Sequence, residues 1–169
     1  RSGGDAVVKP LFGSCGRGMI RVSSEDALAG LLEGVAADGT TTYLQEFVPH
    51  AGWDARILVV GGVGGGEVFA MRRRSASDWR TNLALGGEAE PFAPPPAWVD
   101  LARRAAALLE VDVAGVDLLP DRDGEPLVLE VNAVPGWRGL EGATGADVTG
   151  SFVRWLEGMA GSPPPPCPA

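Results

Sequence analysis

Residues 115–132 constrain the fold most, because they contain two short apolar runs separated by a segment typical of a turn. The runs are residues 115–119 and 127–132, and the segment between them is rich in Pro, Asp and Gly. Turn residues between two runs of β-branched residues and leucine predict an antiparallel hairpin. The sequence therefore predicts two paired strands in this region.

Three polar side chains interrupt the apolar pattern of this hairpin. Because side chains alternate across a strand, Glu130 and Asn132 point to one face, and pairing brings Asp117 to the same face. Carboxylate and amide oxygens are hard ligands, and Mg²⁺ binds one or two carboxylates while keeping water and phosphate ligands. The alternative is a solvated sheet face, and these three residues alone leave both interpretations open.

A second feature is the glycine-rich loop at residues 11–18, which lies between two short apolar runs, residues 6–10 and 19–22. Backbone N–H groups in such a loop can enclose phosphate oxygens, and Lys9 adds a positive charge before it. A simple tight turn explains the glycines equally well. The P-loop pattern, which needs Gly-Lys-Ser/Thr before a helix, is absent.

The charge and composition exclude some classes of function. A net charge of -8 argues against a nucleic-acid partner, because phosphate contacts need clustered Lys and Arg. No apolar run of membrane-spanning length and no signal-peptide pattern is present, so we expect a cytoplasmic protein with no membrane partner. Self-association into a homo-oligomer is left open.

The cysteines and the single histidine give no metal-ligand spacing. Cys15 and Cys167 lie far apart and are expected to be unpaired thiols. His50 lies in a predicted loop, where we expect it to be solvated.

Periodicity predicts the other elements. Helices are expected at residues 23–38, 98–110 and 147–159, and strands at residues 41–48, 54–60 and 67–73, with a glycine-rich turn at 61–66. Residues 74–96 show no clean period and are expected to form a functional or mobile loop. The expected buried faces are Leu28, Leu31, Leu32 and Val35, then Leu101, Ala105, Leu108 and Leu109, then Phe152, Val153 and Leu156.

Seven short segments form a longer pattern when they are taken in order. They are Val7-Val8-Lys9 with residues 13–18, residues 45–48, Asp54-Ala55-Arg56, Met71-Arg72-Arg73, residues 80–83 with Gly86-Gly87, residues 112–117, and residues 130–136. Over residues 5–159 this order resembles the ATP-grasp superfamily of carboxylate-amine ligases, and within it the RimK-like glutamate ligases.

The resemblance implies an α+β ATP-grasp fold, with two antiparallel-sheet lobes, helices, and a nucleotide between the lobes. Residues 1–48 are expected to form a partial N-terminal lobe, residues 49–160 the C-terminal lobe, and residues 161–169 a disordered proline-rich tail. The family carries a further N-terminal domain, whereas eight residues precede Lys9 here. The resemblance therefore implies a fragment, or a missing wall supplied from elsewhere.

The resemblance also assigns roles to residues. The metal ligands are Asp117, Glu130 and Asn132, for two Mg²⁺ or Mn²⁺ ions. The phosphoryl transfer is assisted by Arg73, Arg80 and Asn82, for which a solvated basic loop is the alternative. The ATP phosphates are held by Lys9, Gly13, Ser14, Gly16 and Gly18, and the adenosine by Gln45, Glu46, Phe47, Val48 and Asp54.

In such enzymes a substrate carboxylate attacks the γ-phosphate of ATP, and an amine then opens the acylphosphate to form an amide. The implied substrates are L-glutamate and a carboxylate-bearing acceptor: a tetrahydromethanopterin-type pterin, a deazaflavin or a protein C-terminus. The form of residues 9–14 favours the cofactor-type ligases by resemblance. A non-catalytic nucleotide-binding module and a glutathione-synthetase-like ligase are the alternatives.

Overall fold

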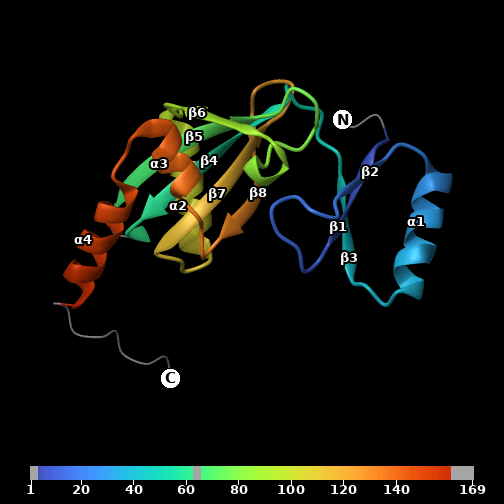
Figure 1. The fold of residues 1–169 in the computed structure, drawn as a ribbon, viewed down its shortest axis with the longest axis horizontal. Coiled ribbons are helices and arrows are strands. Elements are labelled where there is room, and N and C mark those ends of the chain that lie inside the picture. Colours follow the sequence, from blue (N-terminus) through green and yellow to red (C-terminus); the bar gives the residue numbers. More distant parts are fainter. Residues whose placement is uncertain (1–3, 63–65, 161–169) are drawn as a thin grey trace.

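The computed structural model describes residues 4–62 and 66–160, which form two antiparallel sheets with helices against them (Figure 1). The fold is α+β, as the sequence predicts. The smaller sheet has the order β2-β1-β3, with β1 Ala6–Pro10, β2 Ile20–Val22 and β3 Thr42–Glu46. The larger sheet has the order β6-β5-β4-β7-β8, with β4 Trp53–Val60, β5 Glu67–Arg74, β6 Glu88–Pro91, β7 Val113–Pro120 and β8 Pro126–Asn132.

The smaller sheet has one face toward α1 (Glu25–Ala37) and the other toward the larger sheet. Ser24 caps this helix, since its side chain accepts a hydrogen bond from the N–H of Ala27. No residue of α1 is fully buried, so the predicted apolar stripe of this helix is only partly covered. The opposite face carries Lys9, which pairs in register with Tyr43.

The larger sheet holds the main core, which lies around its central strands β4 and β7. Against one face packs α2 (Pro96–Leu108), whose buried residues are Trp98, Ala102 and Ala106. Leu101 and Ala105 are partly buried there, but the prediction that Leu108 and Leu109 are buried is wrong. The helix ends at Leu108, so these leucines leave the packed stripe, and Leu108 is 84% exposed.

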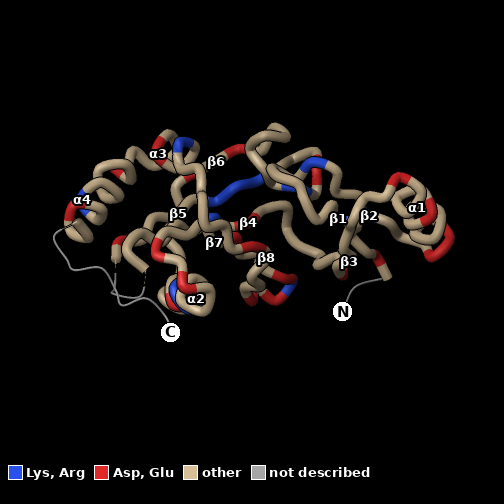
Figure 2. Tube along the Cα trace, turned by 90° about the horizontal axis from the view of Figure 1, so that it is seen from below, with Lys and Arg blue, Asp and Glu red and all other residues tan. Residues whose placement is uncertain are grey.

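The other face of this sheet is covered by α3 (Arg138–Thr144) and α4 (Val148–Ala160), on the opposite side from α2 (Figure 2). In α4, Val148 and Ser151 are buried, and Phe152 and Trp155 pack against the core. The predicted burial of Val153 and Leu156 is wrong, because the helix turns Trp155 toward the sheet instead. Among the described residues, none of the helices is both long and apolar enough to cross a membrane.

The segment predicted as an aperiodic loop contains the edge strand β6 and a short 3₁₀ helix, η2 (Leu83–Leu85). Glu-Ala-Glu-Pro has low strand propensity, so its pattern does not reveal a strand. Its pairing with β5 places Glu90 opposite Arg72 and Glu88 opposite Arg74, and both pairs form ion pairs. Opposite charges across an edge strand offset the weak propensity.

The predicted hairpin is confirmed as β7 and β8, with Asp117 directly opposite Glu130. The register then shifts, since the next pair is Leu118 with Val128, which leaves Leu129 as an extra residue in β8. A bulge of this kind redirects side chains locally. As a result, Leu129 and Glu130 both line the same cleft. The expected tail, residues 161–169, and residues 63–65 of the glycine-rich turn lie outside the described residues.

Candidate functional site

A cleft of about 350 Å³ lies between the two sheets. Its walls come from β1, β3 and the glycine-rich loop on one side, and from β4, β5, the loop after β5, and the β7–β8 hairpin on the other. Basic residues run along β5 toward the middle of the molecule, whereas α1 at the far end is acidic (Figure 2). The two walls of the cleft bring together segments that are far apart in the sequence.

Lys9 lies at the end of β1 and is half-buried in this cleft, where it contacts the Oε1 atom of Gln45. Burial lowers the pKa of Lys9 below the ordinary lysine value, and the negative charge of Glu130 partly opposes this shift. Because Glu130 belongs to the other sheet, a lysine and a carboxylate face each other across the gap. A metal-bound phosphate group suits this arrangement, because the lysine can bind the phosphate oxygens and the carboxylate can bind the metal ion.

The glycine-rich loop closes over the cleft and contacts the opposite lobe. Gly16 has φ +73°, and a Cβ at this position would lie 2.9 Å from the Cγ of Asn82. The carbonyl oxygen of Gly16 accepts a hydrogen bond of 3.3 Å from Arg80 Nη1, and Arg80 in turn pairs with Asp78 at 2.7 Å. Gly13, Ser14 and Gly16 line the cleft, whereas Gly18 does not.

An aromatic group closes the end of the cleft near the segment that joins β3 to β4. Phe47 is buried, its ring meets Trp79 edge-on at 5.9 Å, and the Arg21 guanidinium carbon lies 3.6 Å from its centroid. Gln45, Glu46 and Val48 also line the cleft. The segment expected to hold the adenosine, residues 45–48, therefore offers backbone polar groups beside an apolar ring.

The cleft residues that sequence reasoning missed include Tyr43, His50 and Trp79. The prediction that His50 is solvated is wrong, since it is half-buried and its Nδ1 accepts a hydrogen bond of 3.1 Å from the N–H of Gly52. Burial lowers the pKa of His50, so this ring is neutral at pH 7. Tyr43 shares its strand face with Gln45, and this alternation is the signal that identifies it. Trp79 gives no comparable signal, because it lies in an aperiodic segment.

The two acidic residues of the hairpin lie on the same rung of the sheet but in different surroundings. Asp117 is buried, whereas Glu130 is exposed to the cleft and its carboxylate makes no hydrogen bond or ion pair with the described residues. Asn132 pairs with Gly115 two residues further along, and its Oδ1 accepts a hydrogen bond of 2.9 Å from the N–H of Val134. The structure thus brings Asp117 and Glu130 together and leaves Asn132 outside the cleft lining.

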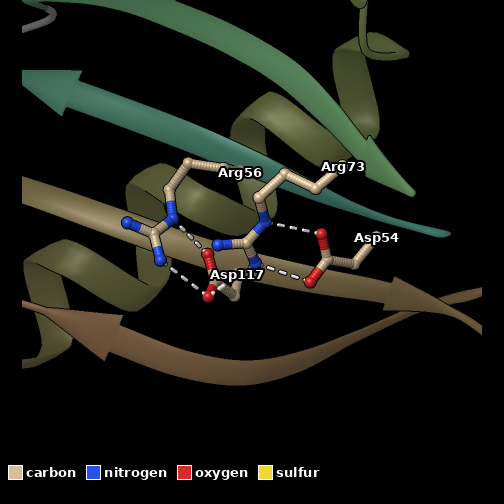
Figure 3. A network of polar contacts seen from close by, with 4 residues as sticks. All are labelled: Asp54, Arg56, Arg73 and Asp117. Atoms are coloured by element: carbon tan, nitrogen blue, oxygen red, sulfur yellow. Dashed lines mark hydrogen bonds and ion pairs between the residues drawn. The ribbon is translucent and has the colours of Figure 1, made fainter. Parts of the chain in front are cut away.

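Asp117 belongs to a buried network of four charged side chains, together with Asp54, Arg56 and Arg73 (Figure 3). Arg56 holds it through two nitrogens, one of them Nη2 at 2.8 Å from Oδ2, and Arg73 Nη2 lies 2.9 Å from the same oxygen. Arg73 also donates to both oxygens of Asp54, at 2.8 and 2.5 Å. Asp54, expected from resemblance near the adenosine, lines the cleft but has its carboxylate engaged by Arg73.

Two members of this network have shifted pKa values. Burial raises the pKa of Asp117, but the guanidiniums of Arg73 and Arg56 outweigh burial and hold it below the ordinary carboxyl value. Burial opposes the charge of Arg73, yet Asp117 and Asp54 together raise the pKa of its guanidinium further. Asp117 and Arg73 are therefore charged at neutral pH.

Two of the three expected metal ligands lie at the cleft side of this network. Glu130 offers a carboxylate and Asp117 lies opposite it, whereas Asn132 lies outside the cleft lining and its Oδ1 accepts a hydrogen bond from Val134. Within the described part of the chain, no three His, Cys, Asp or Glu side chains form a metal cluster. Two carboxylates with open positions match the way Mg²⁺ binds together with nucleotide phosphates.

Solved structures with the same fold include ATP-grasp ligases. The chain superposes on the ATP-grasp ligase PsnB complexed with minimal precursor with a TM-score of 0.71 and 26% identity, covering 93% of this chain and 48% of that one. PsnB complexed with a phosphomimetic variant of minimal precursor, Mg and ADP gives a TM-score of 0.69 and 25% identity, covering 93% and 47%. These neighbours confirm the ATP-grasp fold.

Sequence relatives agree with the fold. The chain is 38% identical over 161 residues to the ribosomal protein bS6–L-glutamate ligase of Shigella boydii serotype 18, covering 94% of this chain and 52% of that protein. The ligase of the same name from Escherichia coli strain K12 is 38% identical over 158 residues, covering 92% and 51%. The chain thus spans about half the length of the curated relatives it matches. Since the profile of the RimK-like ATP-grasp domain matches residues 3–156, the chain belongs to the RimK-like ATP-grasp family.

Proposed function

We propose that this chain binds magnesium-ATP in the cleft between its two sheets and carries out ATP-dependent ligation of a carboxylate to an amine. One observation carries the proposal: Lys9 and the glycine-rich loop face the rung of Asp117 and Glu130 across a single cleft. A cationic, glycine-lined wall suits phosphate oxygens, and two carboxylates opposite suit the metal that phosphates bring with them.

The nucleotide roles follow from the positions of the lining residues. Lys9 and the backbone N–H groups near Gly13, Ser14 and Gly16 would hold the phosphates. The strand end at residues 45–48 would present its backbone to the adenine edge, beside the buried ring of Phe47. Gly18 lies at the end of the same loop, where it would permit the turn into β2 through its φ of +74°.

Asp117 and Glu130, with Asn132 beyond them, would hold Mg²⁺ or Mn²⁺, for which we propose two ions. The metal would neutralise the charge of the β- and γ-phosphates. Glu130 is the more accessible ligand because no described residue occupies its carboxylate. Asp117 is charged but engaged, so its bonds to Arg56 and Arg73 compete with the metal.

The reaction would proceed in two steps. An acceptor carboxylate oxygen attacks the γ-phosphorus, the bond to the β–γ bridging oxygen breaks, and ADP leaves. The neutral amine of the second substrate then attacks the acylphosphate carbonyl, the carbon–oxygen bond to phosphate breaks, and the nitrogen gives one proton to the departing phosphate, which leaves the amide. Arg73, Arg80 and Asn82 line the cleft and would stabilise the negative charge that moves between these groups.

We propose L-glutamate as the amine substrate and a protein or peptide carboxylate as the acceptor. The relatives named above ligate L-glutamate to ribosomal protein bS6, and the PsnB structures contain precursor peptides. These names favour a peptide acceptor over the pterin or deazaflavin that the sequence pattern alone favours. The pterin and the deazaflavin are therefore tested separately from the peptide in the experiment below.

The test is an ADP-release assay with ATP, Mg²⁺, L-glutamate and one acceptor at a time: a peptide ending in glutamate, a pterin or a deazaflavin. Mass spectrometry of each acceptor then detects the gain of one glutamyl unit. We expect ADP release only when glutamate and the peptide are both present. ADP release that is independent of glutamate contradicts the ligase proposal, and binding of magnesium-ATP without turnover on any acceptor supports a nucleotide-binding module instead.

A further inference from the structure

We propose that Asp54 is a positioning residue, which holds Arg73 so that one edge of its guanidinium faces the cleft. This inference rests on the proposed function. The two residues are direct partners in the β4–β5 ladder, so their side chains leave the sheet side by side. Both Asp54 oxygens accept hydrogen bonds from Arg73, from Nε at 2.8 Å and from Nη2 at 2.5 Å (Figure 3).

Some N–H groups of Arg73 have partners among the described residues and others do not. A guanidinium has five N–H groups. Nε and Nη2 are taken by Asp54 and Asp117. Nη1 makes no hydrogen bond to any residue that the structure describes, and Arg73 lines the cleft. The two N–H groups on Nη1 are thus the ones left without a partner among the described residues, and in the proposed arrangement they would meet an anion in the cleft.

Asp54 is poorly suited to bind the nucleotide itself. It is only 3% exposed, and both of its oxygens are engaged in a two-point pair with a guanidinium. A ribose hydroxyl would have to displace one of these charge-assisted bonds, which are stronger than neutral ones. The adenosine contact implied by resemblance therefore gives way to an indirect role through Arg73.

Asp54 is also the partner that Arg73 keeps when Asp117 takes another ligand. Asp117 is shared between Arg56, Arg73 and the proposed metal, whereas Asp54 has Arg73 as its only side-chain partner among the described residues. Without Asp54, Arg73 is held only through one nitrogen at Asp117. A guanidinium held at one point is free to rotate, and small misplacements of catalytic groups reduce rates strongly.

The experiment is a double-mutant cycle with Asp54→Asn, Arg73→Gln and the double variant, measuring the affinity for magnesium-ATP by calorimetry and kcat for ADP release. We expect Asp54→Asn to lower kcat roughly 10- to 100-fold while the affinity changes less than about twofold. In the Arg73→Gln background, Asp54→Asn should have no further effect on kcat, because both act through one guanidinium. Asp54→Glu should recover part of kcat, and Asp123→Asn in the exposed β7–β8 turn is the matched control.

Two results overturn the inference: a full additional loss of kcat in the Arg73→Gln background, or an affinity loss with unchanged kcat, which would indicate nucleotide contact.

If Asp54→Asn fails to fold, the double variant and Asp54→Glu still complete the comparison, since the double variant replaces the buried pair with two neutral amides. The NMR resonance of Arg73 Nε–Hε in the metal-free protein gives an independent readout, and it should shift in Asp54→Asn and stay near its position in Asp54→Glu. A wild-type protein without ADP release refutes the proposed function, whereas an active wild type with an unaffected Asp54→Asn variant refutes only this inference.

Discussion

Substitution of Asp117 by Asn tests the buried charge network directly. The change removes one negative charge from between two guanidiniums and keeps the size of the side chain. Arg73 retains Asp54, but Arg56 loses the only side-chain partner that it has among the described residues. The Arg56 side chain is 14% exposed, so water replaces the lost carboxylate poorly.

Breaking a buried ion pair by removing one partner costs roughly 3–5 kcal/mol, because a buried charge is left uncompensated. Since Arg73 keeps a partner, we expect the lower end, about 3 kcal/mol. For a chain of this length, 1 kcal/mol corresponds to a Tm shift of roughly 2–4 °C, so the expected decrease in Tm is about 6–12 °C.

The measurement is thermal unfolding followed by circular dichroism at pH 7, with Glu130→Gln as the matched control. Glu130 occupies the same rung of the hairpin as Asp117 but is exposed and unpaired. Its substitution is expected to change stability by less than about 0.5 kcal/mol. Equal Tm values for Asp117→Asn and the wild type would refute the argument that this network stabilises the fold.

The same comparison has a defined pH dependence. Because the folded-state pKa of Asp117 is lowered, its contribution to stability is present above the unfolded carboxyl pKa of about 3.9 and is lost as the pH falls through the folded value. The Tm difference between the wild type and Asp117→Asn should therefore be constant from pH 5 to 8 and shrink below about pH 4.

Two further predictions concern the glycine-rich wall of the cleft. Gly16→Ala forces a left-handed backbone on alanine and crowds Asn82, so the affinity for magnesium-ATP should fall roughly 5- to 30-fold by calorimetry, whereas Gly34→Ala, in open space on α1, should leave it unchanged. The lowered pKa of Lys9 means that its charge is lost at a lower pH than for an ordinary lysine of pKa 10.5, so the affinity should start to decrease at a lower pH than an ordinary lysine would give. Lys9→Arg, which stays charged, should remove this decrease, and an unchanged pH profile in this variant would contradict the assignment of Lys9 to the phosphates.

Local patterns were enough to predict the elements that create the cleft. The hairpin follows from turn residues between apolar runs, and strand alternation correctly placed Asp117 and Glu130 on the same face. The glycine-rich loop after Lys9 was equally visible in the sequence. These features depend on neighbours in the chain, which a single sequence contains.

Features that depend on pairing between distant segments were not predictable. The network of Asp54, Arg56, Arg73 and Asp117 requires the register of three strands, which the sequence does not state. The prediction of the buried face of α2 was wrong for a related reason. Small alanines rather than Leu108 lie against the sheet and allow α2 to approach it closely. The bulge at Leu129 likewise arises from pairing, so strict alternation missed this residue in the cleft.

The most direct test of a metal-nucleotide site in the cleft is the affinity for ATP in the presence of Mg²⁺, measured by calorimetry on Glu130→Gln. The Glu130 side chain is exposed and has no hydrogen bond or ion pair with the described residues, so the folded protein should be retained in this variant. We predict that Glu130→Gln loses at least about tenfold in affinity for magnesium-ATP, whereas Glu125→Gln in the exposed turn of the same hairpin binds like the wild type. Wild-type affinity in Glu130→Gln would contradict the account.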